Sequence, residues 1–321
     1  MKLFAGIDLG GTKILAGIVN EKGKILATDK MKTGADEGYK SVIERIVSCL
    51  ENAAQKAKIP MSEIKGLGIG APGLIDVQKG MVLVAPNLPG WKNVPLKKFL
   101  EKKLPFPVFT DNDVNVGLIG EFAFGAGKGM KNGIGLFIGT GIGGGIIING
   151  EIYTGASGIA GELGHIALDI SSDITCKCGI RGCFEALASR STLSKKIENA
   201  VHNDKELKKI KNQFQFPPKS RDIKKLYQTE NHTILEIIDR ECFYIGTAIA
   251  NYVNVFNPEV VILGGGLMES LGGEMIKPIR EYAKRSAFQA GFKDCKIVLS
   301  RLQDNAALIG GAVMAIQKTL T

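Results

Sequence analysis

The sequence predicts an α/β protein in which one strand pattern occurs twice. Near the N-terminus, an apolar, β-rich run over residues 2–9 leads through a glycine turn, Gly10-Gly11-Thr12-Lys13, into a second strand. An apolar run over 134–138 leads in the same way through the glycine-rich turn 139–145. Two such units, well separated in one chain, indicate an internal duplication. We expect each half to begin with a hairpin whose tight turn points at a shared cleft.

Local patterns predict the other elements of the first half. Strands are expected over 14–19 and, after a turn at 20–23, over 24–27. Apolar residues recur at three-to-four spacing from Val42 to Ala54, which indicates an amphipathic helix. A further strand is expected over 65–70, just before Ala71-Pro72-Gly73.

The second half has equally clear signals. Asn149-Gly150 is typical of a type I′ turn in a β-hairpin. A long helix over about 232–256 precedes a strand that runs into Gly264-Gly265-Gly266, where another helix is expected to begin. Backbone N–H groups at such a turn can hold phosphate. Residues 306–318, rich in Ala and Gly, predict a last helix suited to close packing.

Length and charge limit the function classes. With 321 residues and 45% hydrophobic content, the chain is long enough for about two domains. The net charge is +9, but basic residues mostly alternate with acidic ones, which disfavours nucleic-acid binding. The densest basic stretch, 205–225 around Pro217-Pro218, is interpreted as a solvated insertion without the aromatic interleaving of a single-strand binder. The excess positive charge also suits an anionic substrate such as a nucleotide.

Cysteine usage and the N-terminus predict a soluble cytoplasmic protein. Six cysteines in this length are too few for a disulfide framework. The first residues form a short strand and a glycine turn rather than a signal peptide. No apolar run approaches the roughly 20 residues needed to cross a bilayer, so no membrane partner is expected.

Four residues form a candidate zinc site. His165 precedes Cys176, Cys178 and Cys183, and one imidazole with three thiolates is a common structural zinc set. The alternative is a reactive or disulfide-forming cluster, which the single scattering of the other three cysteines disfavours. Two carboxylates, Glu162 and Glu185, flank the set. A structural zinc site does not need them, whereas a site for a polyhydroxylated ligand does.

The first glycine turn has the parts needed to bind ATP phosphates. Its glycines allow backbone N–H groups to approach phosphate oxygens, Thr12 offers a hydroxyl, Lys13 offers a cation, and Asp8 could hold magnesium through water. The turn is not a Walker A loop. On its own it could be a plain β-hairpin, but the second turn, Gly139-Thr140-Gly141, also carries a hydroxyl and favours the phosphate interpretation.

A polar run follows the strand at 108–109 and opens a helix that ends near Gly125. Such residues are expected as helix N-caps, but capping explains only one of them. Phosphoryl transfer to an alcohol needs a carboxylate that accepts the hydroxyl proton. Asp113 is the candidate base and Asn112 a candidate hydroxyl ligand. Asn87 is another candidate hydroxyl ligand. It lies in a Pro-flanked loop beside the only tryptophan, which is expected to be a core residue.

Taken together, these motifs resemble the ROK family of bacterial sugar kinases, in particular its ATP-dependent glucokinases. The resemblance runs almost end to end, and its most specific part is the histidine motif followed by the cysteine motif. The matching motifs are Asp8-Leu-Gly-Gly-Thr-Lys13, Ala71-Pro-Gly73, Pro86-Asn-Leu-Pro-Gly-Trp91, Asn112-Asp-Val-Asn115, Gly139-Thr-Gly-Ile-Gly-Gly-Gly145, Gly161-Glu-Leu-Gly-His-Ile166, Cys176-Lys-Cys-Gly-Ile-Arg-Gly-Cys-Phe-Glu185 and Gly264-Gly-Gly266.

The resemblance implies a fold and an assembly. The fold is an actin-like, ribonuclease-H-like ATPase fold, with two α/β domains around an interdomain cleft that holds sugar and ATP. The smaller domain would comprise 1–112 and 305–321, and the larger domain 113–304. Homodimers or homotetramers are expected.

The resemblance also implies residue roles. Asp113 would be the catalytic base, and Mg²⁺ would accompany ATP. Sugar ligands would be Gly73, Asn87, Asn112, Asp113, Glu162, His165 and Glu185. Nucleotide ligands would be Asp8, Gly10, Gly11, Thr12, Lys13, Gly139, Thr140, Gly141, Gly264, Gly265 and Gly266. Structural Zn²⁺ ligands would be His165, Cys176, Cys178 and Cys183.

The predicted activity is ATP-dependent phosphorylation of glucose at its 6-hydroxyl. Other hexoses stay open as substrates, namely N-acetylglucosamine, N-acetylmannosamine, mannose, fructose and allose, as does polyphosphate as a donor. The family's sugar-responsive repressors are a different class. Their helix-turn-helix would precede the phosphate motif, which here begins by Asp8, so this class is disfavoured. Asp8 and Asp113 are both present, and a catalytically silent sugar sensor is disfavoured as well.

Overall fold

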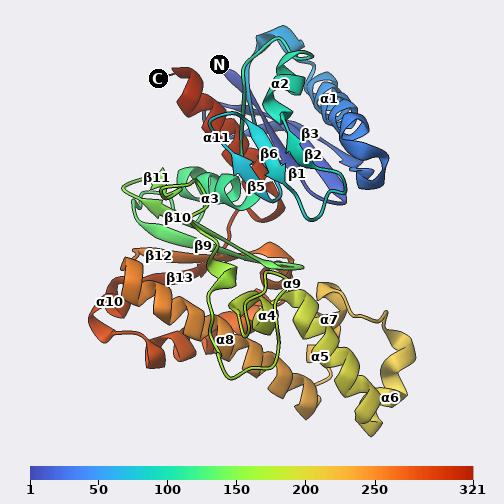
Figure 1. Cartoon of the computed structure of the whole chain (residues 1–321), viewed down its shortest axis with the longest axis vertical. Helices are drawn as coiled ribbons and strands as arrows, with labels where there is room; N and C mark the ends of the chain where they lie inside the picture. The colour runs from blue at the N-terminus through green and yellow to red at the C-terminus, as the bar shows by residue number, and fades with distance from the viewer. Residues whose placement is uncertain (321) are drawn as a thin grey trace. The chain divides into compact units, whose positions relative to one another are not determined.

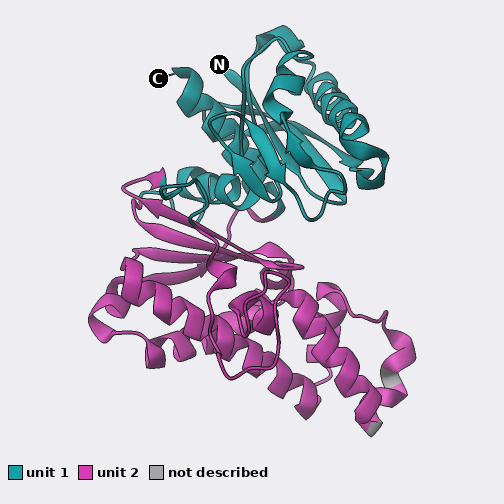
Figure 2. Ribbon diagram, in the orientation of Figure 1, with its two compact units in different colours: residues 1–129, 152–160, 304–321 teal, residues 130–151, 161–303 magenta. Residues whose placement is uncertain are grey.

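The computed structural model describes residues 1–320, and the side chains of all of these except Lys205 and Ile210. The chain divides into two compact units, coloured teal and magenta in Figure 2. Unit 1 comprises residues 1–129, 152–160 and 304–321, and unit 2 comprises residues 130–151 and 161–303. Each unit contains its own main sheet and its own hydrophobic core.

The main sheet of unit 1 has the strand order β3-β2-β1-β4-β8. β1 is antiparallel to β2 across the predicted glycine turn, and β4 and β8 continue the sheet in parallel. All strands expected in this half are present, and the third is longer than expected. The strands are β1 (Leu3–Leu9), β2 (Lys13–Asn20), β3 (Ile25–Lys32), β4 (Ile64–Ala71) and β8 (Val108–Asn112).

Alternation of side chains along β1 directs them to helices on both faces of this sheet. Ala5, Ile7 and Leu9 share a buried core with the apolar stripe of α1 (Gly38–Ala57). Gly6 faces the other way, and a Cβ there would lie 1.8 Å from the carbonyl oxygen of Leu308 in α11 (Ala306–Leu320). Glycine alone permits this approach, so the Ala- and Gly-rich last helix packs directly on β1 and β4.

Two further helices complete unit 1. α3 (Asp113–Phe124) follows β8 without a loop and packs on α11. α2 (Leu96–Glu101) packs near β8. The short 3₁₀ helices are η1 (Ala35–Glu37) and η2 (Met61–Glu63).

A three-stranded sheet in unit 1, with the order β5-β6-β7, escapes the sequence analysis because its strands are too short to display an alternating pattern. Trp91, which immediately precedes β7, is 2% exposed and belongs to the core of unit 1, so the core interpretation of the lone tryptophan is confirmed. The strands are β5 (Leu74–Asp76), β6 (Met81–Val84) and β7 (Lys92–Val94).

The main sheet of unit 2 repeats the strand arrangement of unit 1. Its order is β11-β10-β9-β12-β13, with an antiparallel β9-β10 hairpin and with β12 and β13 in parallel (Figure 1). This shared arrangement agrees with the predicted duplication. The strands are β9 (Gly133–Ile138), β10 (Ile142–Ile148), β11 (Glu151–Ile152), β12 (Val260–Gly264) and β13 (Lys296–Leu299).

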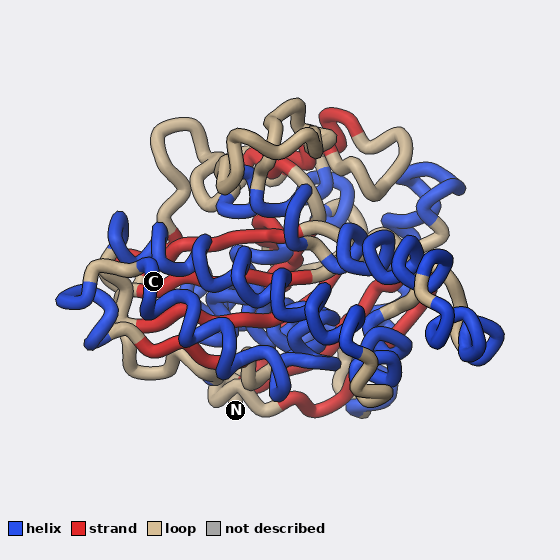
Figure 3. The backbone as a smooth tube through the Cα atoms, turned by 90° about the horizontal axis from the view of Figure 1, so that it is seen from below, coloured by secondary structure: helices blue, strands red, loops and turns tan. Residues whose placement is uncertain are grey.

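Helices pack on the second sheet and on one another. In Figure 3, long helices in blue lie in front of strands in red. α9 packs on β9, β12 and β13, and α8 packs along α9. The helices are η3 (Leu163–His165), α4 (Phe184–Ala188), α5 (Arg190–Asn203), α6 (Lys205–Ile210), η4 (Lys211–Gln213), α7 (Ser220–Tyr227), α8 (His232–Phe256), α9 (Gly265–Ser286), α10 (Gln289–Asp294) and η5 (Gln303–Asn305), the last of which spans the limit between the units.

The lysine-rich segment after α5 exposes most of its described lysines, as its composition indicates, but it also contributes apolar side chains to the core. Leu207 of α6, and Ile223 and Leu226 of α7, are buried in the same core as α8. The hydroxyl of Ser194 in α5 donates to the carbonyl oxygen of Pro218 at 2.6 Å. Charged residues dominate the composition, but burial of these few apolar side chains packs the segment against the core.

The predicted domain limits, 1–112 with 305–321 and 113–304, differ from the compact units mainly because α3 packs on α11 and so lies in unit 1. They stay a prediction.

Within residues 1–320, no helix combines the length and the apolar character needed to span a membrane.

Candidate active site and metal centre

Two predicted site residues lie at the carboxyl edge of the parallel strands in unit 1. Asp8 on β1 is in register with Gly70 on β4, which is in register with Asp111 on β8. Asp113 begins the helix that follows β8. The carboxyl ends of parallel strands are a common place for ligands in α/β folds. The sheet thus brings Asp8 and Asp113, which are far apart in sequence, to the same edge.

Asn112 is the N-cap of α3. Its Oδ1 accepts hydrogen bonds from the backbone N–H groups of Val114, at 2.9 Å, and Asn115, at 3.4 Å. Its Nδ2 donates to the carbonyl oxygen of Gly73 at 3.0 Å, so two predicted sugar ligands contact each other. The capping interpretation is therefore correct for Asn112.

Asp113 lies beside this cap, at the start of the helix. One of its carboxylate oxygens, Oδ1, accepts from the N–H of Val114 at 3.0 Å. The N-terminal end of the helix dipole stabilises a negative charge here. The neighbouring Asp111 is 7% exposed, it accepts from Asn115 Nδ2 at 3.1 Å, and burial raises its pKa. Asp111 is thus held inside the fold by a contact with α3.

The first glycine turn is a tight hairpin turn, in which the N–H of Gly10 donates to the carbonyl oxygen of Lys13 at 2.9 Å. Thr12 is exposed. The ammonium of Lys13 binds Asp304 Oδ2 at 3.0 Å. Asp304 lies in η5, just before α11, and no local signal in the sequence identifies it as a partner of the turn. Burial raises the pKa of Asp8 to about 6, and Lys13 opposes that rise.

The raised pKa of Asp8 predicts a pH-dependent cost to stability. The folded pKa of about 6 exceeds the ordinary value of 3.8. The stability that Asp8 contributes is therefore fully present below pH 3.8 and is lost as pH rises through about 6. The free energy of unfolding of Asp8→Asn, relative to the wild type, should thus increase by on the order of 1 kcal/mol from about pH 5 to about pH 8. Urea unfolding at both pH values measures this gain, with the exposed Asp36→Asn as control. An equal difference between Asp8→Asn and wild type at both pH values would contradict it.

Asn87 is exposed in the loop between β6 and β7. The loop is closed by hydrogen bonds from the N–H of Leu88 to Ala85 and from the N–H of Trp91 to Leu88, and buried Trp91 anchors it. A Cβ on Gly11 would lie 3.0 Å from the carbonyl oxygen of Asn87. The structure thus places the predicted sugar ligand directly beside the first glycine turn.

In unit 2, the second glycine turn and the third glycine loop lie side by side. Gly264 is in register with Phe137 near the end of β9. Gly265 has φ +84°, and a Cβ there would lie 2.7 Å from the backbone of Ile138. This residue must be glycine to let α9 begin so close to the turn. The N-terminus of α9 has no side-chain cap, which leaves its N–H groups available to an anion.

Two side chains hold the second turn. The N–H of Ile142 donates to Glu185 Oε2 at 2.8 Å, and Thr140 Oγ1 accepts from the Arg190 guanidinium at 3.0 Å. Glu185, a predicted sugar ligand, thus also supports the turn. Arg190 is a site residue that the sequence analysis missed, because a single arginine at a helix start carries no distinguishing pattern.

The four predicted metal ligands form a compact cluster. One ligand atom from each of His165, Cys176, Cys178 and Cys183 lies within 4.8 Å of all the others. Ligands around a tetrahedral zinc lie about 3.8 Å apart when the Zn–S bonds are about 2.3 Å. The His165 Nδ1 to Cys176 Sγ distance is 3.8 Å. The donor set and its spacing fit one tetrahedral ion.

The flanking carboxylates lie on different sides of this cluster. His165 directs Nδ1 to the thiols and Nε2 towards Glu162, whose carboxylate is 3.9 Å away. Glu162 is exposed. Glu185 Oε1 lies 3.8 Å from Cys176 Sγ. An ion at Nδ1 would leave Nε2 as a donor on the side of Glu162, where a ligand hydroxyl could bind.

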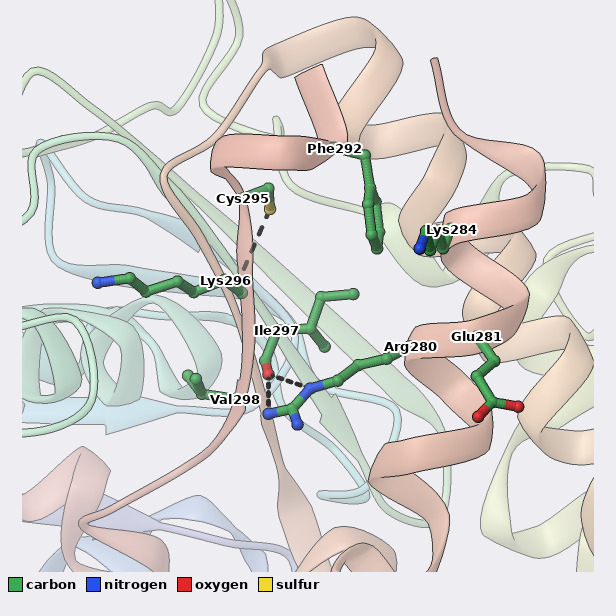
Figure 4. A pocket seen from close by; sticks show the side chains of 8 residues that line it. All are labelled: Arg280, Glu281, Lys284, Phe292, Cys295, Lys296, Ile297 and Val298. Carbon is green, nitrogen blue, oxygen red and sulfur yellow. Dashed lines mark hydrogen bonds between the residues drawn. The ribbon is translucent and has the colours of Figure 1, made fainter. Parts of the chain in front are cut away.

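A separate pocket of about 350 Å³ lies between β13, α9 and α10, and none of its lining residues is a predicted site residue (Figure 4). Arg280 Nε and Nη2 both donate to the carbonyl oxygen of Ile297, at 2.9 and 2.6 Å. β13 is the last strand of its sheet, so Arg280 covers an edge carbonyl that another chain could otherwise bind.

Comparison with known proteins decides the family. The model of the ROK family matches residues 4–318. The chain belongs to the ROK family. This membership confirms the predicted family and the predicted actin-like ATPase fold. The fold is formed here by two main sheets with the same strand arrangement.

ROK relatives include both enzymes and regulators. A glucokinase of Thermotoga maritima is 36% identical over 311 residues, which cover 96% of this chain and 95% of that protein. A xylose repressor of Caldicellulosiruptor bescii is also 36% identical, over 98% of this chain and 78% of the repressor. Among solved structures, a ROK glucokinase from Streptomyces griseus, in complex with glucose and AMPPNP, has a TM-score of 0.83 and 29% identity over 98% of this chain and 99% of that one.

Proposed function

We propose that this protein is an ATP-dependent hexose kinase that phosphorylates glucose at the 6-hydroxyl. The observation that carries the proposal is the placement of Asp113 beside Asn112 and Gly73, at the sheet edge that also bears Asp8 and the first glycine turn. The glucokinase relatives support the same assignment. We also propose a cytoplasmic location and a homodimeric or homotetrameric state.

In this proposal, Asp113 binds the reacting hydroxyl of the sugar. Its carboxylate orients the 6-hydroxyl oxygen and accepts its proton as the bond to phosphorus forms. Asn112, which is held by its two capping hydrogen bonds, keeps α3 and Asp113 in place. Asn87, the Gly73 backbone, Glu162, His165 and Glu185 bind the other sugar hydroxyls.

The glycine turns bind the phosphates of ATP. Backbone N–H groups of the first and second turns, the hydroxyls of Thr12 and Thr140, and the Lys13 ammonium offset negative charge on the phosphoryl group during transfer. Asp8 would hold magnesium, which would supply further charge neutralisation. The uncapped start of α9 at Gly264, Gly265 and Gly266 binds the rest of the nucleotide.

The decisive experiment is ADP release with Mg-ATP in the presence of single sugars. Glucose should give the highest kcat/KM in a panel that also contains mannose, fructose, allose, N-acetylglucosamine and N-acetylmannosamine. Preference for another hexose would keep the mechanism and replace glucose as the substrate. Polyphosphate in place of ATP tests the second donor. Absence of sugar-dependent ADP release from metal-replete protein would refute a kinase.

The repressor relatives favour a sugar-responsive regulator as the second candidate. A regulator would bind sugar without turnover and bind DNA in a sugar-dependent manner. A DNA gel shift with and without sugar distinguishes it from the kinase.

A further inference from the structure

The short helix α4 lies between two parts of the candidate site. Cys183, its N-cap, belongs to the metal cluster, and Glu185 in its first turn accepts from the N–H of Ile142 in the second glycine turn. Just after the helix, Arg190 donates its N–H to Gly139 and its guanidinium to Thr140, both at 3.0 Å. A helix this short has little stability of its own, so its orientation depends on contacts at its ends.

Residues of α5 satisfy the carbonyl groups at the C-terminal end of α4. Thr192 Oγ1 donates to the carbonyl oxygen of Ala186 at 3.1 Å. Lys196 Nζ donates to the carbonyl oxygen of Leu187 at 2.7 Å. A cation at this end is favoured by the helix dipole and satisfies an acceptor that has no partner within the helix. Lys196 is therefore the charged contact that holds the end of α4.

A buried carboxylate holds Lys196 in turn. Glu241 of α8 is 0% exposed, and its Oε2 lies 3.4 Å from Lys196 Nζ. Its Oε1 has no hydrogen-bond partner among the described residues, and burial raises the pKa of this carboxyl to about 7. The ammonium also lies 5.4 Å from the centre of the Tyr244 ring. A buried, half-satisfied ion pair contributes little to stability, but it restricts where its partners can lie.

We propose that Lys196 and Glu241 are positioning residues that set α4 against the second glycine turn, and thereby place Glu185 and Arg190. Neither residue is in the candidate active site itself. The consequence for catalysis rests on the proposed function, because it requires that Glu185 binds sugar. The consequence for the backbone of the turn does not depend on any activity.

Three variants separate positioning from stability, all at pH 8. Lys196→Met removes the donor to Leu187 and leaves Glu241 buried without its cation. Lys196→Met/Glu241→Gln also removes the buried charge, so it should recover thermal stability without restoring the donor. Lys196→Arg keeps a cation and should retain the wild-type amide exchange and sugar KM. The matched control is Lys195→Met, which removes an exposed lysine from the next position of the same helix.

Amide hydrogen exchange at Ile142 and Arg190 measures the placement of α4. Both Lys196→Met and the double variant should exchange at least about tenfold faster there, since each loses a charge-assisted hydrogen bond. The sugar KM should rise by about the same factor in both, whereas Lys195→Met and Lys196→Arg stay near wild type.

Recovery of exchange protection and sugar KM together with stability in the double variant would overturn the proposal, because the pair would then be only structural. Unchanged exchange in Lys196→Met would overturn it as well. If the wild type has no sugar-dependent turnover, the proposed function fails, and faster exchange in both variants would still support the positioning role.

Discussion

Replacement of Asp113 by asparagine is expected to lower kcat about 10²–10⁴-fold while ATP binding is retained. Asparagine has the same size, and its amide oxygen can still accept from the N–H of Val114, as Asp113 Oδ1 does at 3.0 Å. The substitution removes the negative charge of the carboxylate and its ability to take the proton of the sugar hydroxyl. Steady-state kinetics, together with calorimetric titration of an ATP analogue, measures both quantities.

The matched control is Asp36→Asn, which makes the same chemical change at an exposed position in the 3₁₀ helix before α1. It should leave kcat unchanged. A loss of turnover below tenfold in Asp113→Asn would remove Asp113 from the role of base. A large loss accompanied by weaker ATP binding would point to disruption of the start of α3 instead.

Replacement of Cys178 by serine is expected to remove the bound metal and to raise the sugar KM about 10–100-fold, with the ATP KM unchanged. Cys178 is the exposed member of the cluster, so the substitution removes a metal ligand without opening a cavity in the core. Without the ion, His165 loses its fixed orientation, and the loop between η3 and α4 loses the link between His165 and the three thiols. Elemental analysis gives the metal content, and hydrogen exchange follows the loop.

Cys295→Ser, in a cysteine outside the cluster, is the control and should keep about one zinc per chain. Full activity in a zinc-free protein would contradict a role for the metal in sugar binding. Retention of zinc by Cys178→Ser would exclude Cys178 from the ligand set.

Features that depend on neighbouring residues could be predicted from the sequence. Asn149 and Gly150 have φ of 54° and 87°, as the type I′ turn predicted from Asn-Gly requires. α8 spans the residues that its pattern indicates, and α9 begins at the third glycine loop, as expected. The cysteine motif carries its three thiols within eight residues of the chain. Such features are local because backbone propensity and short-range geometry determine them.

Contacts between distant residues could not be predicted in this way. Asp304 binds Lys13 across 291 positions, and Arg190 binds Thr140 across 50. The place of α6 and α7 in the core was also hidden, because a lysine-rich composition conceals a narrow apolar face.

The sequence by itself determined the strand–turn pattern of both halves, the cysteine cluster and the identity of the candidate base. Only the tertiary structure decided that Asn112 caps α3 while contacting Gly73, and that Asp8 is buried enough to raise its pKa. It also decided that Lys196 binds the end of α4 and pairs with Glu241. The reason is physical: burial, charge pairing and strand register depend on which segments meet, and that choice is made by the whole chain when its core forms.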